Sequence, residues 1–237
     1  MRPVERGPCP KDETGGNRVF REYAYARPHL TNRMGDYCSF CEMLLSAALA
    51  VEHIQHKDGN PELECEWDNF LLACPSCNST KGTKVDTAED VLQRLWPHMD
   101  RTFDAFIYGA GRVVHLAAMS DPMLAARAKQ TEAMVGLTRR PGAGLTEAQV
   151  RRGSDNRWKK RREAWDTAIT ARRTLSDADT ADVRSLILAT AHATGFWSVW
   201  MTVFRDDTQM QAALCRTFRG TAKDRVFPLP AHLAPAR

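Results

Sequence analysis

No apolar run in the 237-residue sequence approaches the about 18 consecutive residues that a membrane-spanning helix needs. Residues 1–18 combine glycine, proline and charged side chains without an apolar core, so they are not typical of a secretory signal. We expect this stretch to form a flexible arm. The two absences predict a cytoplasmic protein with no membrane partner. The sequence also shows no internal repeat.

The sequence lacks a strong excess of charge of either sign. Its 33 Lys and Arg residues, set against 29 Asp and Glu residues, leave a net charge of +4. A balance this mild permits a polyanionic partner such as nucleic acid but does not require one. The hydrophobic content of 43% is ordinary for a globular protein. The length is sufficient for one large domain or two small ones.

Cysteine is present in an odd number, which argues against a framework of disulfides. Of the seven cysteines, three are isolated and four form two Cys-x-x-Cys pairs, Cys38/Cys41 and Cys74/Cys77. Two residues between thiolates let both sulfur atoms reach one ion, so the pairs predict a structural Zn²⁺ site with four cysteine ligands. The alternative is chance spacing or redox use of the pairs.

The segment around the cysteine pairs predicts a small unit of two strands and one helix. We expect a strand near residues 47–54, a loop over 55–66 and a second strand in the apolar run 70–73. Pro75 suits the first turn of a helix, and Gly82 suits its end. A unit this small could hardly fold by apolar burial alone, so a zinc staple is physically reasonable.

The rest of the chain is predicted to be mainly helical. Residues 19–34 suggest a helix interrupted near Pro28. A capping pattern at Thr87 and Asp90 begins a helix that is expected to reach Trp96, and residues 105–116 suggest a hairpin. Helical patterns then cover 121–137, 155–175, 180–192, 196–204 and 208–218, with a loop at 140–144 and a loose tail at 227–237.

The helix predicted at 155–175 carries both aromatic and basic residues. Trp158, Trp165 and Ile169 share one face, which we expect to dock on the core. Basic residues crowd around them, including the run from Lys159 to Arg162. This run could grip a phosphate backbone or simply form a solvated face.

Polar residues lie between and after the cysteine pairs in a fixed order. Glu52 and His53 are adjacent, Asn69 follows, and Asn78 comes directly after the second pair, three residues before Lys81. From Tyr37 to Lys84 this array resembles the HNH endonucleases of the ββα-metal class. The resemblance implies an α+β fold, in which a small zinc-stapled ββα-metal unit precedes a mostly α-helical C-terminal half.

The resemblance also implies a role for each polar residue. His53 would be the general base that activates water, Glu52 and Asn78 would bind the catalytic divalent metal, and Asn69 would orient the base. An oxygen ligand such as Asn78 favours Mg²⁺ or Mn²⁺ over Zn²⁺. Asn78 and Lys81 would share one helix face, from which Lys81 could add a charge to the phosphate. The plainer alternatives are a buried histidine, a carboxylate at a strand end, and asparagines that cap a helix or form a turn.

One geometric question and two departures accompany the resemblance, and the second departure is that the last motif position holds Asn78 rather than histidine. Glu52 and His53 are neighbours on a predicted strand, so their side chains point to opposite sides unless the strand ends or bends there. His56 stands where related sequences often have proline. It could be a spare ligand, a phosphate contact or neither.

The sequence therefore predicts a metal-dependent HNH endonuclease acting on DNA or, as the second choice, RNA. We expect an N-terminal arm and lead-in helix at 1–34, the HNH nuclease domain at 35–100 and a mainly helical accessory or partner domain at 101–237. The stretches 27–30, 35–41 and 67–70 also resemble bacterial HNH proteins of antiphage defence systems. Some of those pair with an ATPase, as in Septu-type systems, so a protein partner that gates activity is a further expectation. The alternative is a zinc-stapled module that binds nucleic acid or a partner without catalysis of its own.

Overall fold

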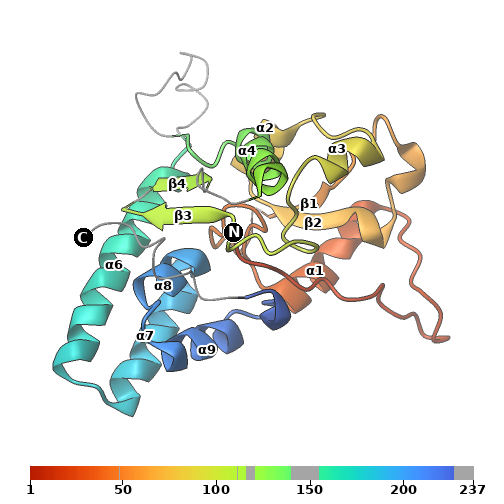
Figure 1. Cartoon of the computed structure of the whole chain (residues 1–237). Coiled ribbons are helices and arrows are strands. Elements are labelled where there is room, and N and C mark those ends of the chain that lie inside the picture. The colour runs from red at the N-terminus through yellow and green to blue at the C-terminus, as the bar shows by residue number, and fades with distance from the viewer. Residues whose placement is uncertain (48, 111, 116–120, 140–154, 227–237) are drawn as a thin grey trace.

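The computed structural model of the chain describes residues 1–47, 49–110, 112–115, 121–139 and 155–226. Within these ranges it combines helices with two small antiparallel sheets, and the C-terminal half is mostly helical (Figure 1). The predicted α+β class is therefore confirmed. The predicted loop at 140–144 and the predicted loose tail at 227–237 lie outside the described residues.

The unit of two strands and one helix has the predicted order. Strand β1 (Ala50–His53) pairs with β2 (Phe70–Ala73), and His53 lies opposite Phe70. All four residues of β2 are buried, as its unbroken apolar run predicts. Helix α2 (Pro75–Lys81) follows directly. Gly82 ends it with φ of +49°, a conformation that only glycine adopts at little cost.

The remaining elements also follow the predicted order. They are α1 (Arg27–Met34), α3 (Ala88–Leu92), β3 (Phe106–Gly109), β4 (Arg112–His115), α4 (Pro122–Val135), α6 (Arg157–Asp177), α7 (Ala181–Thr194), α8 (Trp197–Val203) and α9 (Thr208–Thr217). Helix α3 begins with the predicted capping box of Thr87 and Asp90 but ends at Leu92 rather than Trp96. The chain turns instead at Trp96, whose backbone N–H donates to the Asp100 carboxylate over 2.7 Å.

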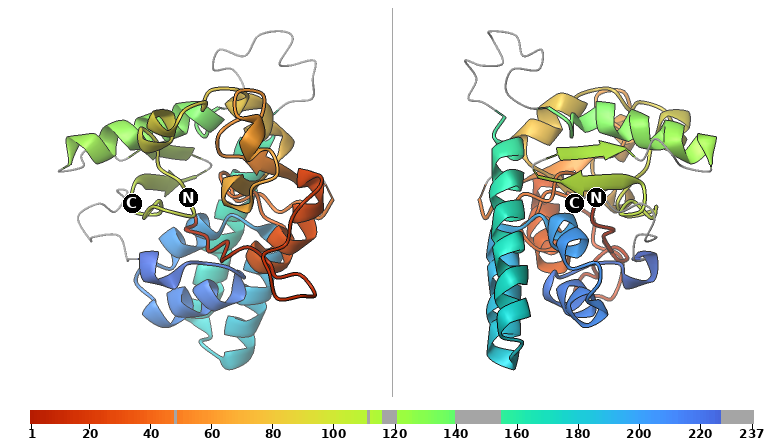
Figure 2. Two further views of the ribbon diagram at one scale, coloured as in Figure 1. Left: turned by 90° about the vertical axis from the view of Figure 1, so that its right-hand side faces the viewer. Right: turned by 60° about the vertical axis from the view of Figure 1, so that its left-hand side comes forward.

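The N-terminal part of the chain, up to residue 100, packs against the mainly helical part that follows it. Helix α6 runs along one side of the molecule, and α7, α8 and α9 gather beside it (Figure 2). The β3–β4 hairpin contacts α4, α6 and α8, and α4 contacts α2 (Figure 1). Buried apolar residues from both halves belong to one hydrophobic cluster, including Phe40, Trp96, Phe103, Trp197 and Trp200. The division at residues 34 and 100 stays a prediction, and the contacts show that these parts share one core.

The expectation of a flexible arm at residues 1–18 is wrong for its first residues. Met1, Arg2 and Val4 are buried. The backbone N–H of Val4 donates to the Pro97 carbonyl over 2.7 Å, and Val4 forms a β-bridge with Thr221. The Arg2 guanidinium donates to the Met34 carbonyl over 2.7 Å. The buried side chains of Met1 and Val4 and the hydrogen bonds of Arg2 therefore hold these first residues in place, although their composition suggested a loose chain.

Two further predictions about helices need correction. Pro28 does not interrupt the lead-in helix; it lies in the first turn of α1, where its missing N–H costs nothing. In α6, Trp165 and Ile169 of the predicted face pack against the core as expected, but the face of Trp158, Trp165 and Ile169 is only partly buried. The fully buried stripe of that helix consists instead of Arg157, Arg161, Ala164, Ala168 and Leu175.

Candidate active site and metal centre

The four paired cysteines converge as predicted. Their sulfur atoms all lie within 4.8 Å of one another, and all four residues are buried. Cys41 Sγ and Cys74 Sγ are 3.6 Å apart. Tetrahedral zinc with Zn–S bonds of about 2.3 Å places its sulfur ligands about 3.8 Å from one another. This four-cysteine metal-binding site therefore has a size that suits structural zinc.

Local hydrogen bonds shape the first half of the cysteine site, the knuckle at residues 38–44. The Cys38 N–H donates to the Met43 carbonyl over 3.0 Å, and the Glu42 N–H donates to the Cys38 carbonyl over 2.9 Å. Ser39 ties this turn to β2, because its N–H donates to the Leu72 carbonyl over 2.8 Å. Burial raises the pKa of the Cys41 thiol well above its usual value. Thiolates in this place therefore need a cation in their midst.

Glu52 and Lys81 form a buried ion pair beside the cysteine site. Lys81 Nζ lies 2.9 Å from Glu52 Oε1, and Glu52 is 5% exposed while Lys81 is fully buried. The second carboxylate oxygen, Oε2, has no hydrogen-bond partner among the described residues. Burial raises the pKa of Glu52, and Lys81 opposes that rise. One oxygen of a buried carboxylate is thus held by an ammonium group while the other remains available.

His53 is held by its ring nitrogen and by aromatic neighbours. Its Nε2 lies 2.9 Å from the Glu64 carbonyl oxygen. The ring packs edge to face against Tyr23, at a centroid distance of 4.9 Å, and against Phe70, at 5.4 Å. Burial lowers the pKa of His53, and Lys81 and Lys57 lower it further, while the Glu64 carbonyl opposes them. The ring is therefore neutral at pH 7.

The two adjacent residues point apart, as the strand geometry requires. Glu52 faces Lys81 on α2, whereas His53 packs on Tyr23 and Phe70. Strand β1 ends at His53. The strand had to end or bend at this point if Glu52 and His53 are to serve one site. The strand end thus leaves Glu52 on the side of α2 and His53 on the side of the loop 55–69.

Asn69 closes that loop rather than contacting the His53 ring. Its Oδ1 accepts from the Gln55 N–H over 2.8 Å, and its Nδ2 donates to the carbonyls of Gln55 and Leu63 over 2.9 and 3.2 Å. In the described part of the chain no hydrogen bond joins Asn69 to His53. Leu63 directly precedes Glu64, whose carbonyl holds the His53 ring, so Asn69 is linked to His53 through the loop backbone.

His56 and Asn78, two of the sequence candidates, occupy different environments. His56 Nε2 lies 3.0 Å from Asp86 Oδ1, and its Nδ1 accepts from the Gly59 N–H over 3.2 Å. Both ring nitrogens are therefore engaged in fastening the loop. Asn78 is partly exposed on α2, one turn before Lys81.

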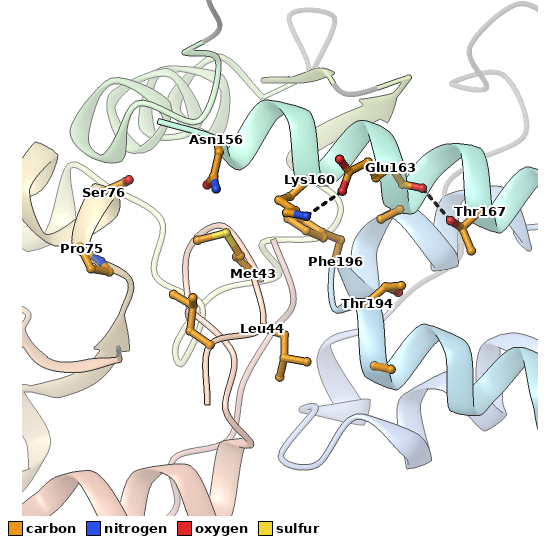
Figure 3. Close-up of a pocket in the computed structure, with 13 residues that line it drawn as sticks. Met43, Leu44, Pro75, Ser76, Asn156, Lys160, Glu163, Thr167, Thr194 and Phe196 are labelled. Atoms are coloured by element: carbon orange, nitrogen blue, oxygen red, sulfur yellow. Dashed lines mark hydrogen bonds and ion pairs between the residues drawn. The ribbon is translucent and has the colours of Figure 1, made fainter. Parts of the chain in front are cut away.

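A cavity of about 620 Å³ lies between the knuckle, the start of α2, α6 and the end of α7 (Figure 3). Met43, Leu44 and Phe196 line it together with Lys160 and Glu163, whose charged groups pair over 2.9 Å. Neither Glu52 nor His53 lines this cavity. The basic residues from Lys159 to Arg162 therefore have different environments. Lys160 lines the cavity, whereas Arg161 is buried.

Sequence reasoning missed three contributors to these sites. Tyr23 and the Glu64 carbonyl hold His53, but a backbone carbonyl leaves no signal in a sequence. Arg157 donates from Nη1 to Cys77 Sγ over 3.0 Å. Its spacing of four residues from Arg161, in register with Ala164 and Ala168, was the available signal for a buried face.

Comparison with known proteins identifies the same segment of the chain. Residues 37–84 match the family model described as HNH endonuclease, so this stretch is an HNH endonuclease domain. It contains both cysteine pairs and the residues Glu52, His53, Asn69, Asn78 and Lys81.

A region of 80 residues is also 34% identical to the Septu protein PtuB of Bacillus thuringiensis. That region is 32% of this chain and 31% of PtuB, so the likeness covers about a third of either protein. Together the two matches support a nuclease-type function. In the described residues, no helix is long and apolar enough to cross a membrane.

Proposed function

We propose that this protein is a metal-dependent endonuclease that hydrolyses phosphodiester bonds, with DNA as its main substrate and His53 as its general base. The tautomer of His53 carries the proposal. A carbonyl oxygen can only accept, so the 2.9 Å contact with Glu64 makes Nε2 the donor. In the neutral ring Nδ1 then bears the lone pair and can take a proton from water.

The lowered pKa of His53 suits that role. Burial, Lys81 and Lys57 all disfavour the protonated ring, so the base is ready at neutral pH. Asn69 is the proposed positioning residue. It holds the loop backbone at Gln55 and Leu63, and this loop presents the Glu64 carbonyl to the ring.

Glu52 and Asn78 are the proposed holders of the catalytic ion. The unpartnered, buried Oε2 of Glu52 is an oxygen donor of the kind that Mg²⁺ and Mn²⁺ prefer, and Asn78 offers a second oxygen. Lys81 keeps the other oxygen of Glu52 occupied and its charge balanced. When bound, such an ion would stabilise negative charge on the phosphate and on the leaving 3′ oxygen. The direct phosphate contact predicted for Lys81 stays a prediction, because its ammonium group is buried against Glu52.

The test is cleavage of supercoiled plasmid by the wild type and by His53→Ala, each with Mg²⁺, Mn²⁺ or EDTA. We expect wild-type cutting that EDTA abolishes, and a loss of about 100-fold or more in His53→Ala, since general-base catalysis contributes about 10² to 10⁴. Zinc content per chain should be equal in both. His192→Ala is the matched control, because His192 is exposed on α7 and its ring contacts Tyr37 and Phe218 rather than the loop 55–69. It should retain cleavage.

Cleavage by His53→Ala at the wild-type rate would refute the role of His53. If the folded, zinc-loaded wild type never cuts DNA or RNA, either alone or with its gating partner, but binds DNA in a salt-dependent way that His53→Ala does not change, the protein is a binding module instead. The likeness to a Septu protein supports a role in antiphage defence with a gating partner such as an ATPase. Full activity of the isolated chain would argue against such gating.

A further inference from the structure

Arg157, at the start of α6, contacts the four-cysteine site from the other half of the molecule. Its Nη1 donates to Cys77 Sγ over 3.0 Å, and 80 positions separate the two residues. The same nitrogen donates to the Val135 carbonyl over 2.8 Å, and Nη2 donates to the Gly136 carbonyl over 3.1 Å. Asp155 accepts from Nε over 2.7 Å and also contacts Nη2. The guanidinium group is therefore fixed in place.

The charge of a filled cysteine site explains why an arginine belongs there. Four thiolates around one Zn²⁺ carry a net charge of about −2, and all four cysteines are buried. A buried net charge is costly unless opposite charges and hydrogen bonds compensate it. Arg157 is 2% exposed, and Arg161, one turn further along α6, is also buried. Arg161 lines a small cavity together with Cys41 and Glu42.

We propose that Arg157 is a positioning residue of the zinc site: its hydrogen bond to Cys77 Sγ stabilises the bound thiolates, so that α6 controls how tightly the nuclease domain retains zinc. The bond joins a rigid planar donor with five N–H groups to a sulfur atom that would keep lone pairs free to accept a hydrogen bond when it binds an ion. Residues that hydrogen-bond to metal ligands typically contribute about 10- to 100-fold to metal affinity.

The rival explanation is that Arg157 merely fastens α6 to the end of α4, through Val135, Gly136 and Asp155. That role would affect folding but not the electronic state of the sulfur ligand. A measurement on the metal site itself separates the two. Replacing zinc with Co²⁺ gives a sulfur-to-metal charge-transfer band, whose energy falls when a hydrogen bond to the thiolate is lost.

The experiment compares full-length wild type, Arg157→Gln, Arg157→Lys and Arg162→Gln. Each is titrated with a chromogenic chelator to measure zinc affinity, and each is examined by absorption with Co²⁺. We expect Arg157→Gln to bind zinc about 10- to 100-fold more weakly and to shift the band to lower energy. Arg157→Lys keeps the positive charge but lacks the planar guanidinium group. Its zinc affinity and its band energy should lie between those of the wild type and Arg157→Gln. Arg162→Gln is the control on the same helix, because Arg162 is exposed and pairs only loosely, at 3.8 Å, with Asp166. It should match the wild type.

A folded Arg157→Gln with wild-type zinc affinity and an unmoved band would overturn the proposal. If that variant does not fold, the wild type loaded with ¹¹³Cd decides by NMR. We expect slowly exchanging Arg157 guanidinium protons that couple to ¹¹³Cd across the N–H···S bond. Exchange as fast as that of exposed Arg162, without coupling, would overturn the proposal equally. Neither readout requires nuclease activity, so the outcome is independent of the function proposed above.

Discussion

Glu52 and Lys81 show how one pair of side chains can serve both the fold and the site. Both are buried, and their charged atoms lie 2.9 Å apart. Such a pair adds little net stability compared with an apolar pair, yet removal of one partner is costly because the other charge remains buried. The same arrangement leaves Glu52 Oε2 for an ion.

Lys81→Met should therefore be strongly destabilising. It leaves the Glu52 carboxylate without its cation, and the expected cost is about 3 to 5 kcal/mol of unfolding free energy. The double variant Glu52→Gln/Lys81→Met should recover most of this loss. Lys57→Met is the control, because Lys57 and Glu64 form a comparable pair at 3.2 Å that is about 40% exposed on each side. It should cost less than about 1 kcal/mol. Urea denaturation measures all three, and equal losses for Lys81→Met and Lys57→Met would contradict the argument.

His98 gives the fold a dependence on pH that does not involve the metal sites. Burial, with smaller contributions from Arg6 and Arg225, lowers the pKa of His98 from 6.5 to about 3. Its Nδ1 is buried without a hydrogen-bond partner in the part of the chain that the structure describes. Below pH 6.5 the unfolded chain binds a proton at this residue and the folded chain does not. The stability is therefore complete above about pH 6.5 and falls as the pH falls toward 3.

At pH 5 this difference amounts to about 2 kcal/mol, taking 1.36 kcal/mol for each of about 1.5 pH units. His98→Phe keeps the ring contact with Trp96, whose centroid is 6.3 Å away, and removes the titrating group. Between pH 7 and pH 5 this variant should lose about 2 kcal/mol less stability than the wild type. Chemical denaturation at both pH values measures the difference. Parallel loss in the two proteins would show that His98 is not responsible.

At the scale of elements, most of the secondary structure could be predicted from local patterns. The capping box at Thr87, the proline that begins α2 and the glycine that ends it all act through neighbouring backbone groups. The convergence of the cysteines could be predicted too, because the spacing within each pair and the match of the two pairs favour one ion. The expected chemistry also required the strand to end or bend at Glu52 and His53, because neighbouring side chains on a strand point to opposite sides. Strand β1 does end at His53.

The errors concern elements whose environment is set by distant residues. Residues 1–4 resemble a free arm in composition, but Pro97 and Thr221 provide their partners. The face of α6 was assigned from Trp158, Trp165 and Ile169, of which Trp165 and Ile169 pack against the core, but the burial of Arg157 and Arg161 was not predicted. An arginine is normally exposed, and only the cysteine cluster across the core gives a reason to bury one. The spacing of Arg157 and Arg161 in register with Ala164 and Ala168 marks the buried face, but it does not show which groups compensate the two buried charges.

At the scale of the whole molecule, the cysteine site lies where the two halves meet. Besides Arg157, the knuckle joins the C-terminal half through a β-bridge between Met43 and Gly195 and a 3.0 Å bond from the Phe196 N–H to the Glu42 carbonyl. The Glu42 carboxylate also accepts from the backbone and hydroxyl of Ser198, over 2.7 and 2.6 Å. Order in the knuckle is thus coupled to order in α8.

Removal of zinc should therefore loosen both halves together. Treatment with a strong chelator is expected to lower the melting temperature of the full chain by at least about 10 °C, or about 3 to 5 kcal/mol at this size, in a single transition. Hydrogen exchange should show faster exchange in α8 as well as in β1 and β2, because Glu42 can hold Ser198 only while the knuckle keeps its shape. Restored zinc should restore protection in both places, whereas Mg²⁺ should not, since it prefers oxygen ligands. If the chelator exposes β1 and β2 while α8 keeps its full protection, the helical half folds independently of the zinc site and the coupling described here is absent.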